Sequence, residues 1–245
     1  MYIPVFLQVN YLIDEAFSVG KGANSIIFML HHFLHHHGFG ETNLHLHVNN
    51  CCGQNKNRFM IQYLMWRVLA GLNDEIKMSF FPVGHTKFSP DWCFGLFKRL
   101  FRRTKIGSLN DIAAVVKQSA TVNHPELVGS QDGAIIVPFY NWSEFFDPYM
   151  AQTALKGISK MHHFRFSALN PGIVYVKNSC NDKEKPVKLL KTPWQSTLAN
   201  MPNAIPPPGL TLERQWYLYN KIREFCPEVA KDIVCPKPST PLPQQ

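Results

Sequence analysis

Apolar positions along the chain switch between two spacings, one typical of strands and one typical of helices. Leu44, Leu46 and Val48 alternate with histidines at a period of two, which predicts a half-buried strand over 44–48. Apolar residues recur at helical spacing over 58–72, and β-branched and aromatic residues over 2–13 predict an opening strand. The chain is therefore expected to alternate strand and helix.

The remaining apolar runs extend this alternation. Further helices are predicted over 25–37, 90–105 and 110–120, and further strands over 76–81, 134–138, 164–168 and 172–176. A strand–helix–strand order favours an α/β layer architecture with at least one parallel strand pair.

Proline is concentrated at the end of the chain, where ten of the 18 prolines lie after residue 190. Four segments are expected: a main domain over 1–192, a Pro-rich linker over 193–209, a helical segment over 210–235 and a disordered, Pro-rich tail over 236–245. Thr211 is the expected N-cap of the helical segment, and Pro227 is its expected stop.

Composition excludes several classes of protein. Hydrophobic residues make up 45% of the 245 residues and aromatic residues 13%, so we expect a packed core rather than a disordered chain. No apolar run reaches the roughly 18 residues that span a bilayer, so no membrane partner is expected. The first residues lack the features of a secretory signal. Six cysteines are too few for a disulfide scaffold, which favours thiols in a reduced, intracellular compartment.

The charge adds a candidate partner. Lys plus Arg is 25 and Asp plus Glu is 17, which leaves 25 − 17 = +8 and suggests an anionic partner, most commonly nucleic acid. Five cations without an acid stand within eight residues: Lys98, Arg99, Arg102, Arg103 and Lys105. The pattern over 94–101 predicts that Phe94, Phe97, Leu100 and Phe101 face the core and that the cations lie opposite.

This basic run has two interpretations. It is either a solvated face with cations at the favoured C-terminal end of a helix, or a surface that follows phosphates. A second basic run is expected in a surface loop or short hairpin, and the sequence assigns it no role: Lys183, Lys185, Lys188 and Lys191.

Candidate chemistry lies after two of the central strands. Val48-Asn-Asn-Cys-Cys-Gly-Gln-Asn-Lys-Asn57 is a polar loop between a strand and a helix, where ligands bind in open α/β sheets. A tight turn with helix caps explains the same composition, and both interpretations stay open. Asp91 follows Ser89 and Pro90, so it either complements the helix dipole or holds a divalent metal. His85, in Gly84-His-Thr86, has either a role at that site or a turn-stabilising hydrogen bond.

These segments together resemble a eukaryotic, mobile-element-associated family that is known only as a domain of unknown function. The matching residues are Gly53-Gln-Asn-Lys-Asn57, Gly84-His-Thr86, Asp91, Phe94-Gly95, Glu15 and Lys21-Gly-Ala-Asn-Ser25. The family motif is Asp-Asn-Cys-x-Gly-Gln-Asn-Lys-Asn, and its first position is Asn49 in this chain. The similarity spans residues 10–235.

The resemblance implies an RNase-H-like mixed sheet flanked by helices, as in transposases and integrases. In that fold three carboxylates hold two Mg²⁺ ions for phosphodiester transfer. Position 49 takes the second place and Asp91 the third, with His85 nearby, and the first strand with its carboxylate is expected to precede Met1. An Asn carbonyl is a poorer ligand for a hard cation, so the resemblance implies a vestigial site.

We therefore expect no cofactor, or Mg²⁺ at Asp91 if the site is intact. Asp14 or Glu15 rebuilding the site is the competing possibility. The resemblance also makes candidate motif-loop residues of Asn50, Gly53, Gln54, Asn55, Lys56 and Asn57.

The histidines of 31–37 form a separate patch. His31 and His35, like His32 and His36, are spaced i,i+4 and share a helix face, so each pair could chelate Zn²⁺ or Ni²⁺. Histidines 45 and 47, on the next strand, could add a ligand. A structural zinc site wants four ligands, so a surface helix without metal is the favoured interpretation.

The leading hypothesis is a transposon-derived domain that has lost catalysis and binds nucleic acid, with DNA favoured over RNA. Nuclear residence follows only from that partner, and the sequence does not indicate the oligomeric state. An active Mg²⁺-dependent nuclease or strand-transferase stays open, as does a vestigial or protein-interaction domain.

Overall fold

A computed structural model describes residues 6–81, 89–131, 134–135, 138–151, 153–191 and 201–241. The chain divides into two compact units, each described by itself below. Unit 1 comprises Met1–Val19, Lys87–Val137 and Pro207–Gln245, and unit 2 comprises Gly20–Thr86 and Pro138–Pro206. The sequence-based boundaries at 192, 209 and 235 stay a prediction.

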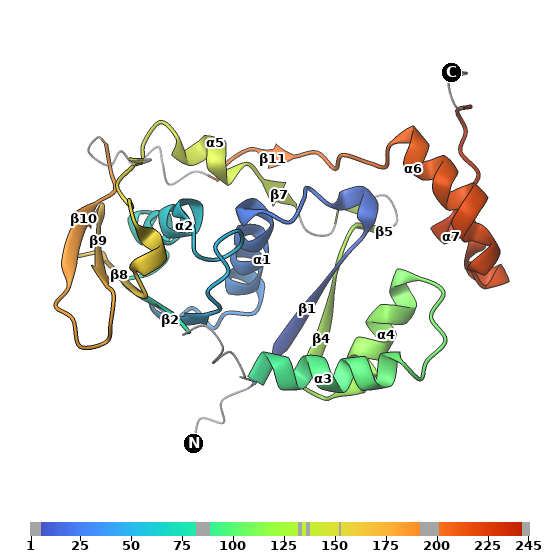
Figure 1. Ribbon diagram of the computed structural model, residues 1–245, viewed down its shortest axis with the longest axis horizontal. Coiled ribbons are helices and arrows are strands. Elements are labelled where there is room, and N and C mark those ends of the chain that lie inside the picture. The colour runs from blue at the N-terminus through green and yellow to red at the C-terminus, as the bar shows by residue number, and fades with distance from the viewer. Residues whose placement is uncertain are drawn as a thin grey trace. The chain divides into compact units, whose positions relative to one another are not determined.

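Unit 2 is built on a mixed five-stranded sheet, at the left of Figure 1. Its strands, in spatial order, are β10 (Lys185–Lys188), β9 (Ile173–Lys177), β8 (His163–Ser167), β3 (Glu75–Phe80) and β2 (Asn43–Val48). β2 and β3 are parallel, and every other pair in this sheet is antiparallel. The β9–β10 pair is the short hairpin expected around the second basic run.

Helix α2 (Arg58–Leu69) connects the two parallel strands and forms the centre of the core. Nine consecutive residues, Met60–Val68, are buried, so this helix has no solvent-facing side. α1 (Ala23–His36) and α5 (Trp142–Phe146) pack against it. The rings of Trp66 and Trp142 meet nearly edge to face, with centroids 4.9 Å apart.

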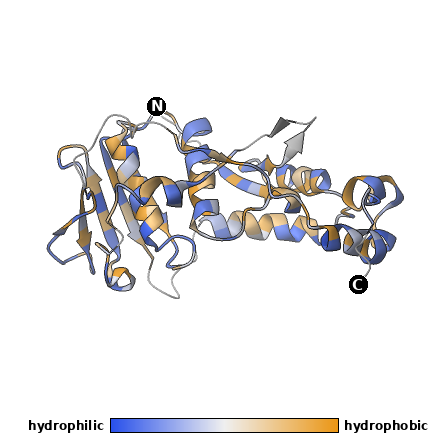
Figure 2. Cartoon of the chain, turned by 90° about the horizontal axis from the view of Figure 1, so that it is seen from above, coloured by the Kyte–Doolittle hydropathy of each residue, from blue (hydrophilic) through white to orange (hydrophobic). Residues whose placement is uncertain are grey.

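The strands of this sheet alternate between a buried and an open face. In β3, Ile76, Met78 and Phe80 point into the core, and the residues between them point to the other face. Figure 2 shows this alternation as orange and blue segments on the strands at the left. The short strands β7 (Phe139–Tyr140) and β11 (Ala204–Ile205) form a separate antiparallel pair in unit 2.

Unit 1 contains a second parallel pair, β1 (Gln8–Ile13) with β4 (Asn123–Val128). α4 (Leu109–Ser119) packs on both strands and on α3 (Ser89–Phe101). The other elements of the unit are a 3₁₀ turn (Glu15–Phe17), β5 (Ser130–Gln131), β6 (Ala134–Ile135), α6 (Leu212–Tyr217), a π-helical turn (Leu218–Ile222), 3₁₀ turns (Arg223–Phe225 and Glu228–Ala230) and α7 (Lys231–Val234). The predicted N-cap is confirmed, since Thr211 accepts a hydrogen bond from the Arg214 N–H.

The predicted α/β class with parallel strands and flanking helices is confirmed. The RNase-H-like assignment and the missing first strand stay predictions. The helix predicted over 90–105 is too long, because α3 ends at Phe101 and a turn follows it. The strand predicted over 134–138 is reduced to Ala134–Ile135, and β4 was not predicted.

Within the described residues, no helix is both long enough and apolar enough to cross a membrane. All six cysteines are free, and the two sulfur atoms of Cys226 and Cys235 are 3.7 Å apart.

Substitution of two glycines of unit 2 can measure how tightly the chain packs beside the β9–β10 hairpin. Gly172, ahead of β9, has φ +82°, and a Cβ there would lie 2.6 Å from Leu190 Cδ1. Gly157 has φ +79° with open space around it. We predict that Gly157→Ala lowers the free energy of unfolding by about 1–2 kcal/mol through backbone strain alone. Gly172→Ala should cost about 1–3 kcal/mol more through overpacking.

Urea denaturation of both variants measures this difference, and Gly157→Ala is the matched control because it shares the left-handed φ. Equal losses for the two variants would show that Leu190 moves aside freely and that the close packing of this edge is wrong.

Candidate functional site

The polar loop between β2 and α2 is organised around two carbonyl oxygens. The Cys51 backbone carbonyl accepts from the backbone N–H groups of residues 54–56, at N···O distances between 2.8 and 3.3 Å. The Asn49 side-chain carbonyl accepts from the Cys51 N–H at 3.2 Å and from Asn55 Nδ2 at 2.7 Å. The one side-chain oxygen that Asn49 could offer a cation is therefore already engaged twice within its own loop.

Asn57 joins the loop to α2 as the N-cap of that helix. Its Oδ1 accepts from the Met60 N–H at 3.1 Å, and its Nδ2 donates to the Gln54 carbonyl at 2.9 Å. These hydrogen bonds fit the interpretation of the loop as a tight turn with a helix cap. The side chains of Asn50 and Gln54 make no hydrogen bond among the described residues, and Gly53 is exposed. A ligand-binding role for this loop stays a prediction.

Lys56 anchors the same loop to the core. Its side chain is only 2% exposed, and its Nζ donates to the Ser159 carbonyl at 2.9 Å. The ammonium also lies 5.0 Å from the centroid of the Phe80 ring, a cation–π contact. Burial lowers the pKa of Lys56, and the nearby Cys52 opposes this effect. Lys56 therefore points away from solvent and is unavailable to a ligand above the loop.

The residues expected to form a vestigial metal site are not brought together within one unit. Asn49 belongs to unit 2 and Asp91 to unit 1, where Asp91 is exposed in the first turn of α3. His85 lies outside the described residues. The helix-dipole interpretation of Asp91 is consistent with its position, and its role as a metal ligand stays a prediction.

The two acids that could have rebuilt the site have structural contacts in unit 1. Asp14 caps the 3₁₀ turn through a hydrogen bond from the Ala16 N–H at 2.9 Å. Glu15 forms a two-pronged ion pair with Arg214, at 2.8 and 2.9 Å. In the described parts of either unit taken alone, no three His, Cys, Asp or Glu side chains have ligand atoms close enough to share a metal ion.

The basic run over 98–105 is fully on the surface. All five of its cations are exposed, and none of them forms an ion pair among the described residues. Lys98 and Arg99 lie in the last turn of α3, where the helix dipole favours cations. The other three follow the helix end, and the Arg103 N–H donates to the Leu100 carbonyl at 2.9 Å. The helix places these cations in one short stretch without a neutralising acid.

The prediction that Phe94 and Phe101 face the core is wrong. Their side chains are 50% and 38% exposed, and Cys93 is fully buried. The inward side of α3 therefore comprises Cys93, Phe97 and Leu100, of which Phe97 and Leu100 were predicted. The rings of Phe94, Phe97 and Phe101 follow one another, with centroids 5.6 and 5.5 Å apart. Lys98 Nζ lies 5.6 Å from the Phe94 centroid, so aromatic and cationic groups share the exposed side.

The histidine patch divides into half-buried and exposed residues. His31 is half-buried and packs among Tyr63, Trp66 and Trp142, with ring centroids between 5.3 and 6.0 Å away, and the interpretation of the patch as metal-free stays a prediction. Burial, then Arg67 and the neighbouring histidines, lower its pKa to about 4. His35 is exposed and stacks on His31 at 6.3 Å. Histidines 45 and 47 point to the open face of the sheet, opposite the core side, and do not join this patch.

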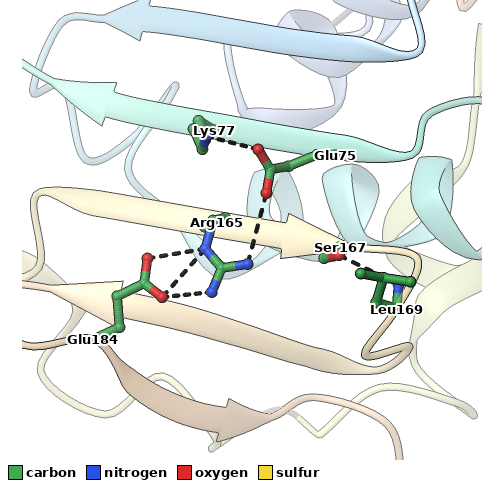
Figure 3. Close-up of polar contacts among 6 residues, drawn as sticks. All are labelled: Glu75, Lys77, Arg165, Ser167, Leu169 and Glu184. Atoms are coloured by element: carbon green, nitrogen blue, oxygen red, sulfur yellow. Dashed lines mark hydrogen bonds and ion pairs between the residues drawn. The ribbon is translucent and has the colours of Figure 1, made fainter.

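A polar network that sequence spacing did not indicate covers the open face of β3 and β8 (Figure 3). Arg165 makes a two-pronged ion pair with Glu184 and lies 3.7 Å from Glu75, which also pairs with Lys77 at 2.7 Å. The Glu184 hydrogen bonds raise the pKa of Arg165 and lower that of its partner. The cations of this face are therefore largely neutralised.

Beside this network, the side chains of three residues lie in a row: Cys180, His163 and Ser79. Cys180 Sγ is 3.3 Å from His163 Nε2, and His163 Nδ1 is 3.0 Å from Ser79 Oγ. Burial, Lys177 and His162 lower the pKa of His163, so its imidazole is neutral near pH 7. The three residues come from β3, β8 and the β9–β10 turn, too far apart in sequence for any spacing rule to find.

A hollow of about 450 Å³ next to β9 collects a second group of cations. It is lined by Lys156, Lys160, Lys177, Lys183 and Lys185. Asp182 is the one acid in its lining, and its carboxylate already accepts from the Ser179 N–H at 2.9 Å. In the described part of the chain, none of these five lysines forms an ion pair. The second basic run thus contributes to a strongly cationic surface.

One comparison with known proteins gives a match. A family model for a domain of unknown function (DUF7869) matches residues 8–182, a span that includes the polar loop and α3. No curated protein and no solved structure matches the chain.

Asn49 provides a test of the loop. We predict that Asn49→Ala lowers the free energy of unfolding by about 1–2 kcal/mol, because two hydrogen bonds to its side-chain oxygen are lost. Asn49→Asp is the matched control, since a carboxylate accepts the same two hydrogen bonds, and its stability should equal that of the unchanged chain. Chemical denaturation measures both, and a stable Asn49→Ala variant would contradict the turn-stabilising role.

His31 gives the fold a pH dependence. The unfolded chain binds this proton near the ordinary pKa of 6.5 and the folded chain only near 4, so between these pH values the unfolded state holds more protons. Stability should therefore fall as the pH is lowered from 6.5 towards 4, by up to about 3 kcal/mol. Denaturation curves at several pH values measure it. His31→Gln should flatten the profile, and the exposed control His45→Gln should leave it unchanged; the reverse result would contradict the assignment.

Proposed function

The chain belongs to this family of domains of unknown function, and from that membership we propose that it is a non-catalytic, DNA-binding domain of mobile-element origin. The observation that carries the proposal is the exposed run of five cations over 98–105 without an ion pair among the described residues. Unpaired exposed cations in one stretch give a local positive potential that attracts phosphates. An RNase-H-like ancestry is part of the proposal, and the mixed sheet with its parallel β2–α2–β3 connection is its support.

The aromatic residues of α3 make the proposal more specific. Trp92 and Phe94 are 62% and 50% exposed and lie on the same helix as the cations. Exposed rings beside a cationic track are the usual platform on which unpaired bases stack. We therefore propose that the preferred ligand is single-stranded or locally unpaired DNA. The lysine hollow of unit 2 would add a second phosphate-binding surface.

Loss of catalysis is supported by the contacts of the expected site residues. The Asn49 carbonyl is engaged within its loop, and Asp14 and Glu15 are engaged in a cap and an ion pair. A two-metal site needs several carboxylates that are free to bind two metal ions about 3.5–4 Å apart. The protein-interaction hypothesis uses the same exposed aromatic rings, but it does not account for five cations without an acid.

The salt dependence of DNA binding tests the proposal. If all five cations contact phosphates, log K should fall with log[salt] at a slope of about −3.5 for a single strand and about −4.5 for a duplex. Replacing Arg102 and Arg103 by Gln should reduce the duplex slope by about 1.8, and charge reversal of both should abolish binding. Lys117→Gln with Lys237→Gln changes the net charge equally at exposed sites elsewhere and should keep the slope.

Fluorescence anisotropy of a labelled oligonucleotide measures these slopes. A flat salt dependence, or equal losses in the control pair, would contradict the assignment of DNA binding to the basic run over 98–105. The same samples with added Mg²⁺ separate the nuclease hypothesis: we expect intact DNA, whereas cleavage that Asp91→Asn abolishes would establish an active site.

A further inference from the structure

Arg67 is a buried cation without a charge partner in unit 2. It lies in the last turn of α2 and is 7% exposed. Its Nε donates to Asn73 Oδ1 at 2.7 Å, and its Nη1 donates to the Tyr63 hydroxyl at 3.2 Å. Among the described residues, no carboxylate lies within 4.0 Å of its guanidinium and no hydrogen bond is made by Nη2. A buried charge held only by neutral groups is costly unless an anion joins it.

The two neutral partners of Arg67 hold its planar head in one orientation. Asn73 is 3% exposed, and its Nδ2 donates to the Glu41 backbone carbonyl at 2.9 Å. Burial raises the pKa of Tyr63 to about 12, so the phenol is neutral and does not compensate the guanidinium. The head is therefore fixed by hydrogen bonds but not neutralised.

The same contacts determine which ring nitrogen of His31 carries its proton. His31 Nδ1 lies 3.2 Å from the Tyr63 hydroxyl, which already accepts from Arg67. The buried phenolic hydrogen is satisfied only if it is donated to Nδ1. The neutral His31 then carries its proton on Nε2, as a second donor beside the guanidinium.

A pocket of about 230 Å³ brings these groups together. Arg67, His31, His35 and Asn73 line it, with Glu41 as the one acid in its lining. The Glu41 carboxylate accepts from the Phe39 N–H at 2.9 Å, which turns one of its oxygens to its own loop. The pocket thus offers the Arg67 N–H groups that Asn73 and Tyr63 leave unused, held in a fixed orientation beside imidazole groups, and arginine is a common ligand of phosphate.

We propose that this pocket binds a phosphate monoester or inorganic phosphate through Arg67 and His31. The sequence carries a signal for it, because Arg67 is the one charged residue in the apolar stretch Phe59–Leu69. The site lies in unit 2, whereas the basic run over 98–105 lies in unit 1, so the inference goes beyond the proposed function and does not rest on it.

Titration of the full chain with inorganic phosphate, at constant ionic strength set by chloride, tests the proposal. Calorimetry should show saturable binding, and the NMR pKa of His31 should rise from its unliganded value near 4 because an anion stabilises the imidazolium. Arg67→Gln should weaken binding by about 10- to 100-fold. Glu41→Gln should tighten it by roughly two- to fivefold, because a nearby like charge is removed while the acceptor for Phe39 is kept.

The Glu41→Gln and His35→Ala variants change exposed residues, so they keep the test decisive if Arg67→Gln does not fold. A 5′-phosphorylated oligonucleotide compared with its 5′-hydroxyl form distinguishes a nucleic-acid end from the free anion as the source. The Arg102→Glu, Arg103→Glu chain should still bind phosphate, which separates this site from DNA binding. No saturable phosphate binding, or binding that Glu41→Gln and His35→Ala both leave unchanged, would overturn the proposal.

Discussion

The complete burial of α2 is the constraint on which the rest of unit 2 depends. A helix with nine consecutive buried residues has no side on which a polar group can meet water, so each polar side chain needs an internal partner. Two cations, one near each end of the helix, have such internal partners. Lys56, just before the helix, reaches the Ser159 carbonyl, and Arg67, in its last turn, is held by Asn73 and Tyr63.

The two cations have opposite consequences for binding. Lys56 is covered and fixes the polar loop as a capped turn, so the most distinctive stretch of sequence serves mainly to hold the start of α2. Arg67 is also buried but borders a pocket, which makes it the centre of a proposed anion site. Helix α3 of unit 1 is the converse case, because its exposed rings and cations have few internal contacts and are available to an outside partner.

Much of the fold could be predicted from the chain, because period-two and helical spacings report which side of an element is buried. The strand at 44–48 and the helix that starts at Arg58 are examples. The prediction for α3 placed Phe94 and Phe101 inward, whereas the buried residue of this helix is Cys93. The lysine hollow and the Cys180–His163–Ser79 line depend on strand pairing between distant segments, which no local spacing reports.

Hydrogen–deuterium exchange of the full chain, with and without a single-stranded DNA oligonucleotide, shows which of the two segments contacts DNA. If DNA binds the exposed end of α3 and the polar loop has a structural role, exchange should slow over residues 94–105 when DNA is present and stay unchanged over 49–57. Slower exchange over 49–57 with no change over 94–105 would contradict both assignments.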